Sequence, residues 1–89
     1  MILHLNLKGE YFDAIKAGTK QYEYRECTEY WQKRLQGKEF DGIVLKRGYP
    51  SGDDTSKILK RPWRGWVVRT ITHPHFGDKP VTVFAIRVN

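Results

Sequence analysis

The sequence predicts a small α+β domain in which several short strands form a partly closed, mixed β-barrel with two short helices. Three observations support this prediction. The chain has 89 residues, which is enough for one hydrophobic core and a single domain over residues 1–89. Short strand patterns recur between turn residues, and both helical patterns fall in the first half of the chain. No internal repeat, linker or low-complexity segment divides it.

The first elements have the clearest periodicity. Residues 2–7 alternate between leucine and other residues, which is typical of a half-buried strand. The next segment places Phe12 and Ile15 at helical spacing and ends at Gly18, a residue favoured just past the C-terminus of a helix. A second strand is expected over 21–27.

A second helix is expected over 29–36. Thr28 can cap its N-terminus, and Gly37 lies just beyond its end. A third strand runs over 41–47. It is followed by a loop over 48–56, which is rich in Gly, Pro, Ser and Asp.

Two more strand patterns, over 65–73 and 81–88, complete the chain. Residues 51–60 are interpreted as a mobile loop, placed so that it could fold over a cleft as a lid. Trp66, at the start of a strand, is expected in the core.

Positive charge is concentrated in the later part of the chain. Residues 1–30 hold four Lys/Arg and five Asp/Glu, a net charge of −1, whereas residues 31–89 hold twelve and five, a net charge of +7. Such a surplus suggests a face that attracts polyanions, nucleic acid before anything else. The aromatic residues strengthen this prediction, because rings that stack on bases commonly accompany cations that hold phosphates.

The sequence contains no apolar run long enough to span a bilayer and no signal-peptide pattern at its start, so no membrane association and a cytoplasmic location are expected. The single cysteine, Cys27, cannot form an internal disulfide. Its acidic neighbours Glu26 and Glu29 disfavour a thiolate, which argues against a nucleophilic cysteine.

The segment "GTKQYEYRE" combines opposite charges with two tyrosines. In a strand, alternate side chains share a face, so Glu23 and Arg25 are expected to point the same way and to pair at the floor of a groove. Lys20 has the wrong parity to join them by simple pleating. It would have to reach the polar side from the turn after Gly18. The alternative interpretation is that these are surface ions of little energetic value.

The pattern Gly18-x-Lys20-x-x-Glu23-x-Arg25 resembles the signature of the ASCH family, the activating-signal-cointegrator homology domains. The order of strand, glycine-terminated helix and motif strand is also similar, so the resemblance covers the whole chain. It implies a PUA-like β-barrel whose cleft, beside the first helix and lined by the motif, binds RNA or a nucleobase.

The resemblance also implies two enzymatic possibilities. Some ASCH proteins are ribonucleases, and another branch removes acyl groups from N4-acetylcytidine. Carried over by position, Lys20 and Glu23 are candidate catalytic residues and Arg25 a candidate ligand contact. In the amidohydrolase branch the position of Glu23 is a threonine, so the glutamate counts against the same amide-cleaving mechanism. A lysine and a carboxylate can still activate a water.

Four further residues are candidates for RNA contact: Arg34, Arg47, Tyr49 and Trp63. Arg34 and Arg47 would extend the surface toward the RNA backbone, and Tyr49 would stack on a base. Trp63 is expected to be an exposed ring, although stacking with a neighbouring arginine would give the same sequence pattern.

His73 and His75 flank a proline without a third clear ligand, so neither a metal site nor a cofactor is predicted. Either imidazole could serve as a general base.

The leading hypothesis is therefore binding of RNA or a nucleobase by the motif cleft. Three alternatives remain: RNA cleavage by Lys20 with Glu23 or a histidine, hydrolysis of a modified cytidine nucleoside, and a protein-interaction module whose basic face meets an acidic partner.

Overall fold

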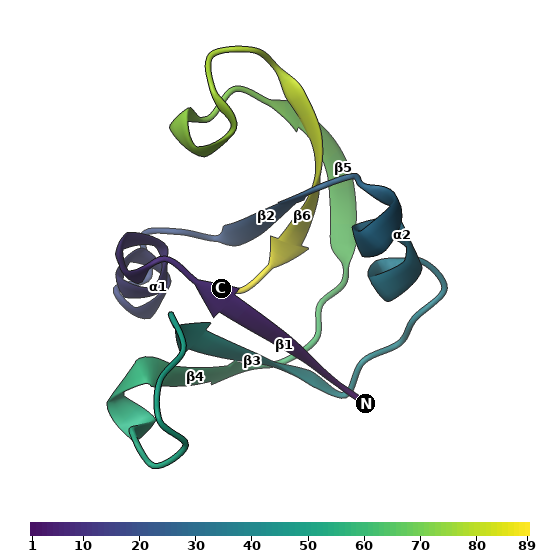
Figure 1. Ribbon diagram of the computed structural model, residues 1–89. Helices are drawn as coiled ribbons and strands as arrows, with labels where there is room; N and C mark the ends of the chain where they lie inside the picture. The colour runs from purple at the N-terminus through teal and green to yellow at the C-terminus, as the bar shows by residue number, and fades with distance from the viewer.

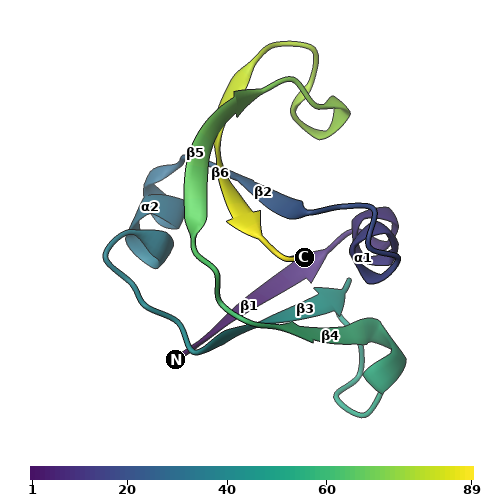
Figure 2. The same ribbon diagram turned by 180° about the vertical axis from the view of Figure 1, so that it is seen from behind.

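A computed structural model describes all 89 residues. The chain forms a small α+β structure, with two α-helices and six strands in two open three-stranded sheets (Figures 1 and 2). The predicted α+β class with two short helices is confirmed. None of the helices has both the length and the apolar character needed to span a lipid bilayer.

The first sheet has the order β1-β3-β4. Strands β1 (Ile2–Leu7) and β3 (Gly42–Arg47) pair in parallel, and β4 (Ile58–Arg61) adds to β3 in the antiparallel direction. Every second residue of β1 is buried, as the alternation in its sequence predicts.

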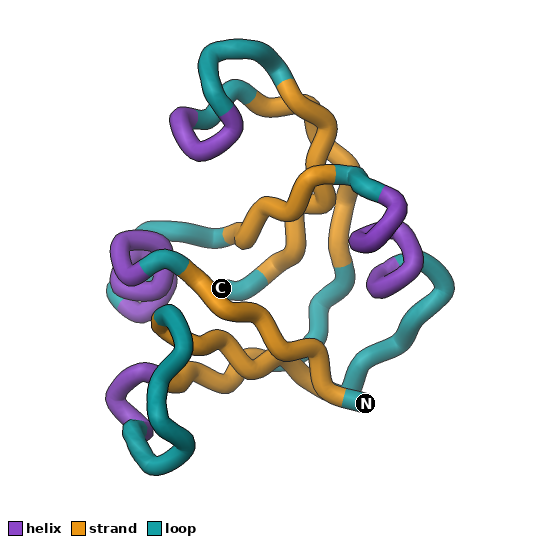
Figure 3. The backbone as a smooth tube through the Cα atoms, in the orientation of Figure 1, coloured by secondary structure: helices purple, strands orange, loops and turns teal.

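The second sheet has the order β2-β6-β5 and is antiparallel throughout. Strand β6 (Val81–Arg87) lies between β2 (Tyr22–Glu26) and β5 (Trp66–Ile71). The connection from β5 to β6 contains a short 3-10 turn, η2 (Pro74–Phe76), and bends back toward the side of the molecule that carries the first helix (Figure 3).

The two helices lie on opposite sides of the pair of sheets (Figures 1 and 2). Helix α1 (Gly9–Lys16) buries Phe12 and Ile15. Helix α2 (Glu29–Leu35) buries Leu35, and the Thr28 hydroxyl accepts a hydrogen bond of 3.3 Å from the Trp31 N–H, as a side-chain cap does.

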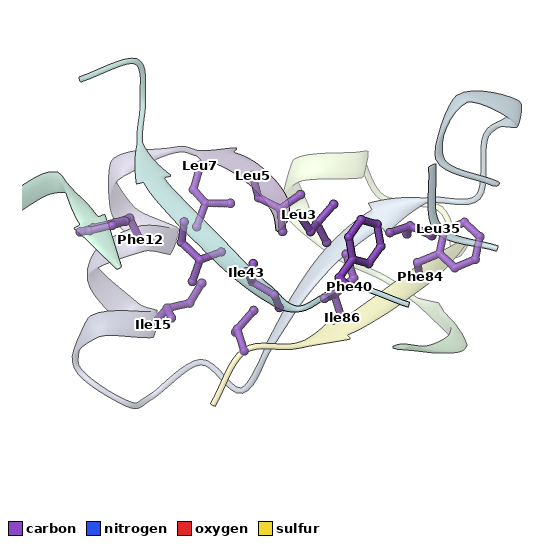
Figure 4. Close-up of a cluster of buried hydrophobic side chains, with 12 residues drawn as sticks. Leu3, Leu5, Leu7, Phe12, Ile15, Leu35, Phe40, Ile43, Phe84 and Ile86 are labelled. Carbon is purple, nitrogen blue, oxygen red and sulfur yellow. The ribbon is translucent and has the colours of Figure 1, made fainter. Parts of the chain in front are cut away.

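One apolar core joins these layers. Figure 4 shows how its side chains converge from both sheets and both helices. The buried members are Leu3, Leu5, Leu7, Phe12, Ile15, Leu35, Phe40, Ile43, Leu45, Phe84, Ile86 and Val88. Trp66 packs partly buried against this core, with its ring 4.8 Å from that of Phe84.

One expectation about the strands was wrong. Residues 58–60 belong to strand β4, whereas the sequence suggested a mobile loop over 51–60. The strand has only four residues and depends on pairing with β3, a long-range interaction that its own sequence does not signal. No backbone ladder joins one sheet to the other, so the two sheets remain open and no closed barrel is formed.

The alternation of β1 makes a direct prediction about stability. Leu5→Ala should lower the free energy of unfolding by about 2–5 kcal/mol, because it removes a fully buried side chain and leaves a cavity. The control His4→Ala changes the neighbouring exposed side chain and should stay within about 0.5 kcal/mol. Urea denaturation of both variants measures the difference. Equal effects would mean that the assigned face of β1 is wrong.

Candidate functional site

The turn between α1 and β2 places the first motif residue. Gly18 has a φ angle of 81°, which favours glycine, and the N–H groups of Thr19 and Lys20 both donate to the Ala14 carbonyl. The side-chain amide of Asn89 donates to the Lys20 carbonyl over 2.8 Å. The backbone of Lys20 is therefore held from two sides.

Glu23 and Arg25 form the predicted ion pair. Arg25 Nη2 lies 2.8 Å from Glu23 Oε2 and 3.0 Å from the carbonyl oxygen of Asn6, at the end of β1. Glu23 is only 5% exposed and is the one buried ionisable residue of the chain. The predicted pairing of Glu23 with Arg25 is thus confirmed.

Lys20 approaches the pair from the turn, with aromatic rings as its neighbours. Its Nζ lies 4.5 Å from the ring centroid of Tyr24 and 5.3 Å from that of Tyr11. At these distances both rings attract the ammonium group through their π faces. No carboxylate lies within ion-pair distance of Lys20.

Burial shifts the ionisation of both groups. Desolvation lowers the pKa of Lys20, and the negative charge of Glu23 opposes that shift in part. Desolvation raises the pKa of Glu23, and this effect outweighs the opposing charges of Arg25 and Lys20. The two pKa values therefore shift toward each other.

These residues lie in a pocket of about 290 Å³ at the free edge of β2. Residues from β1, α1, β2, α2 and η2, and from the segments that adjoin them, form its wall. The lining residues are Asn6, Lys8, Tyr11, Lys20, Glu23, Tyr24, Arg25, Glu26, Thr28, Trp31, His73, His75 and Phe76. We call this hollow the motif pocket.

Aromatic rings make up much of its wall. His73 and His75 pack edge-on against Tyr11, with ring centroids 5.6 and 5.9 Å apart, and so join η2 to α1. Trp31 of α2 lies 5.0 Å from the Arg25 guanidinium carbon. The motif pocket thus combines flat π faces with two carboxylates and three cationic side chains.

The other four predicted contact residues do not line the motif pocket. Arg34 lies next to it, with its guanidinium 4.9 Å from the Trp31 ring. Arg47 forms an exposed ion pair of 3.2 Å with Asp13. Tyr49 is 90% exposed.

The fourth of these residues, Trp63, was expected to be an exposed ring, and this was wrong. Its ring is partly buried and packs edge-on against Phe40, at a centroid distance of 4.8 Å. A proline and two arginines beside it suggested a solvated segment, but Phe40 supplies an apolar surface that is distant in sequence.

Sequence reasoning missed several residues of the pocket wall. The helical spacing around Tyr11 and Trp31 indicates only that each belongs to a face of its helix. The imidazoles of His73 and His75 can serve as metal ligands or general bases, but nothing in their spacing indicates that they lie near Lys20. The available signal was compositional: aromatic residues and histidines occur in helix and loop segments that must pack near the motif strand.

In comparisons with protein-family models, with curated proteins and with solved structures, no match was found. The resemblance to ASCH proteins therefore depends on the four motif residues and on the order of the elements around them.

The raised pKa of Glu23 makes a prediction about stability and pH. Because its pKa is higher in the folded than in the unfolded chain, the folded protein binds more protons between the two values. The contribution of Glu23 to the free energy of unfolding is then most favourable below the unfolded pKa. It declines as pH rises through the folded pKa, by about 1.4 kcal/mol for each pH unit that separates the two values.

We therefore expect the stability of wild type relative to Glu23→Gln to fall as pH rises from about 4. Urea denaturation at a series of pH values measures this difference. Glu29→Gln, which removes an exposed carboxylate, is the control. A relative stability that increases with pH would mean that pairing with Arg25, and not burial, dominates the ionisation of Glu23.

Proposed function

We propose that this chain is an ASCH-type protein that binds RNA or a nucleobase in the motif pocket. In this proposal the two open sheets correspond to a PUA-like β-barrel. The observation that carries the proposal is the convergence of Lys20, Glu23 and Arg25 in one pocket whose wall also contains aromatic rings.

The chemistry of the wall suits a nucleobase. Tyr11, Tyr24 and Trp31 lie in the wall, and stacking of a base on such rings tolerates any base. The carboxylate of Glu23 can accept hydrogen bonds from an amino group on a base edge, as acidic side chains do from cytosine N4. The volume of about 290 Å³ is at the small end of ligand pockets and accommodates one base more readily than a large cofactor.

The cationic side chains of the wall are suited to the negatively charged part of the ligand. Lys20 has no carboxylate partner within ion-pair distance, and Lys8 lies on the same wall. In this proposal both lysines contact a phosphate that flanks the bound base. Arg25 holds the Glu23 carboxylate in position and so orients the hydrogen-bond acceptor.

A second candidate function is RNA cleavage in the same pocket. It is favoured by the opposite pKa shifts of Lys20 and Glu23, which bring an amine and a carboxyl closer to neutral pH. His73 and His75 provide two further groups suited to proton transfer. Hydrolysis of a modified cytidine has less support, because the only threonine of the wall, Thr28, is engaged in capping α2.

One titration tests this proposal. Labelled single-stranded RNA is titrated with wild type, with Lys20→Ala and with the control Lys16→Ala, which removes an exposed lysine of the same helix–turn segment. Lys20→Ala should weaken binding about tenfold or more, as expected when a charge-assisted hydrogen bond is removed, and Lys16→Ala less than about twofold. Affinity of wild type should also fall steeply with added salt.

The length of the RNA after the titration separates binding from turnover. Shortened RNA with wild type but not with Lys20→Ala would identify a ribonuclease. Intact RNA that binds wild type more tightly than the variant would identify a binding protein. If neither RNA nor a modified nucleoside such as N4-acetylcytidine binds, the proposal is overturned, and nuclease-treated pull-downs for an acidic protein partner become the next step.

A further inference from the structure

Outside the motif pocket, arginines gather around Tyr22 on the second sheet. Arg69 of β5 and Arg87 of β6 both donate to the Tyr22 hydroxyl, over 3.3 and 3.4 Å. Their guanidinium carbons lie 4.4 and 5.4 Å from the centroid of the Tyr22 ring. Tyr22 and Arg87 are register partners on adjacent strands, so the cluster is built on regular sheet geometry.

No carboxylate side chain compensates this positive charge. None of the ion pairs of the chain includes Arg64, Arg69 or Arg87. Arg87 also contacts the main-chain oxygen of Asn89. The hydrogen bond from Arg87 and the charge of Arg69 lower the pKa of Tyr22, which is the response of a phenol to positive surroundings.

The cluster borders a shallow hollow of about 370 Å³. Its lining residues are Tyr22, Arg64, Gly65, Trp66, Val67, Ala85 and Arg87. We call this hollow, together with the guanidinium of Arg69 over Tyr22, the arginine groove. The fork of N–H donors on a guanidinium group matches the geometry of phosphate oxygens.

The arginine groove and the motif pocket adjoin each other along β2. Tyr22 lines the groove and Tyr24 lines the pocket. The two tyrosines are two positions apart on one strand, which is about 6.8 Å. Ala85, the register partner of Tyr24, lines the groove. Tyr24 therefore lies at the boundary between the two hollows.

We propose that the arginine groove binds the phosphodiester backbone of a single-stranded RNA whose base occupies the motif pocket. This inference rests on the proposed function. It narrows the proposed ligand from RNA or a nucleobase to single-stranded RNA. A strand gains ~3.4 Å per nucleotide even when it is helical, so a few nucleotides are long enough to span the separation of about 6.8 Å and reach both hollows. A free nucleoside carries no phosphate and leaves the groove empty.

Arg64 and Arg69 are the residues to change. Both are exposed and neither lines the motif pocket, so Arg64→Gln/Arg69→Gln should fold normally. Arg87 is left intact because it contacts Asn89, whose amide holds the backbone of Lys20. The matched control, Lys38→Gln/Lys60→Gln, removes two exposed positive charges outside both hollows.

Fluorescence anisotropy with a labelled single-stranded RNA decamer measures the affinity of each protein. Relative to wild type, Arg64→Gln/Arg69→Gln should bind the decamer about tenfold more weakly. The slope of log affinity against log salt concentration should become shallower by about 0.7 for each phosphate that the variant no longer neutralises. The lysine control should change affinity less than about threefold.

Each outcome decides at least one of the two proposals. If the arginine variant and the lysine control bind the decamer equally while Lys20→Ala fails to bind it, the groove inference is overturned and the motif pocket proposal stands. If wild type binds a free nucleoside as tightly as the decamer, the groove inference also fails. If wild type binds neither, both proposals fail. If the arginine variant stops binding an acidic protein partner and its RNA affinity is unchanged, the groove is a protein-binding surface instead.

Discussion

The ion pair between Glu23 and Arg25 is the interaction on which the arrangement of the site depends. A single nitrogen, Arg25 Nη2, donates to both the Glu23 carboxylate and the Asn6 carbonyl. It thereby joins β2 to β1 at a place where the two sheets share no backbone ladder. The opening between the sheets is thus bridged by a side chain, and the motif pocket lies beside that bridge.

Burial of the Glu23–Arg25 pair lowers the stability of the fold. A buried carboxylate loses its hydration, and one ion pair seldom restores all of that free energy. The raised pKa of Glu23 is the sign that burial dominates. Arg25 adds to the cost, because its Nε is buried without a hydrogen-bond partner. An apolar pair would pack here at lower cost, so the stability of the fold does not account for these charges.

Features that depend on residues close together in the sequence were predicted well. Much of the candidate site depends instead on residues that are far apart in the sequence. The alternation of β1, the cap at Thr28 and the ion pair of the motif each depend on neighbours within a few positions. Strand β4 instead exists because β3 offers an edge, and Trp63 is covered because Phe40 lies next to it. The pocket wall likewise joins segments more than forty residues apart, and only the packing of η2 against Tyr11 places the histidines there.

The distribution of charge connects the two hollows with the sequence. The motif pocket is close to neutral, since three cationic side chains face two carboxylates. The surplus of +7 lies in residues 31–89, the part of the chain that supplies Arg64, Arg69 and Arg87. The net charge that suggested a polyanionic ligand therefore does not come from the motif that suggested a nucleobase. Attraction of phosphates over long range and selection of a base at short range are separate physical tasks. In the binding mode we propose, the arginine groove performs the first and the motif pocket the second, and both hollows are lined by residues of β2.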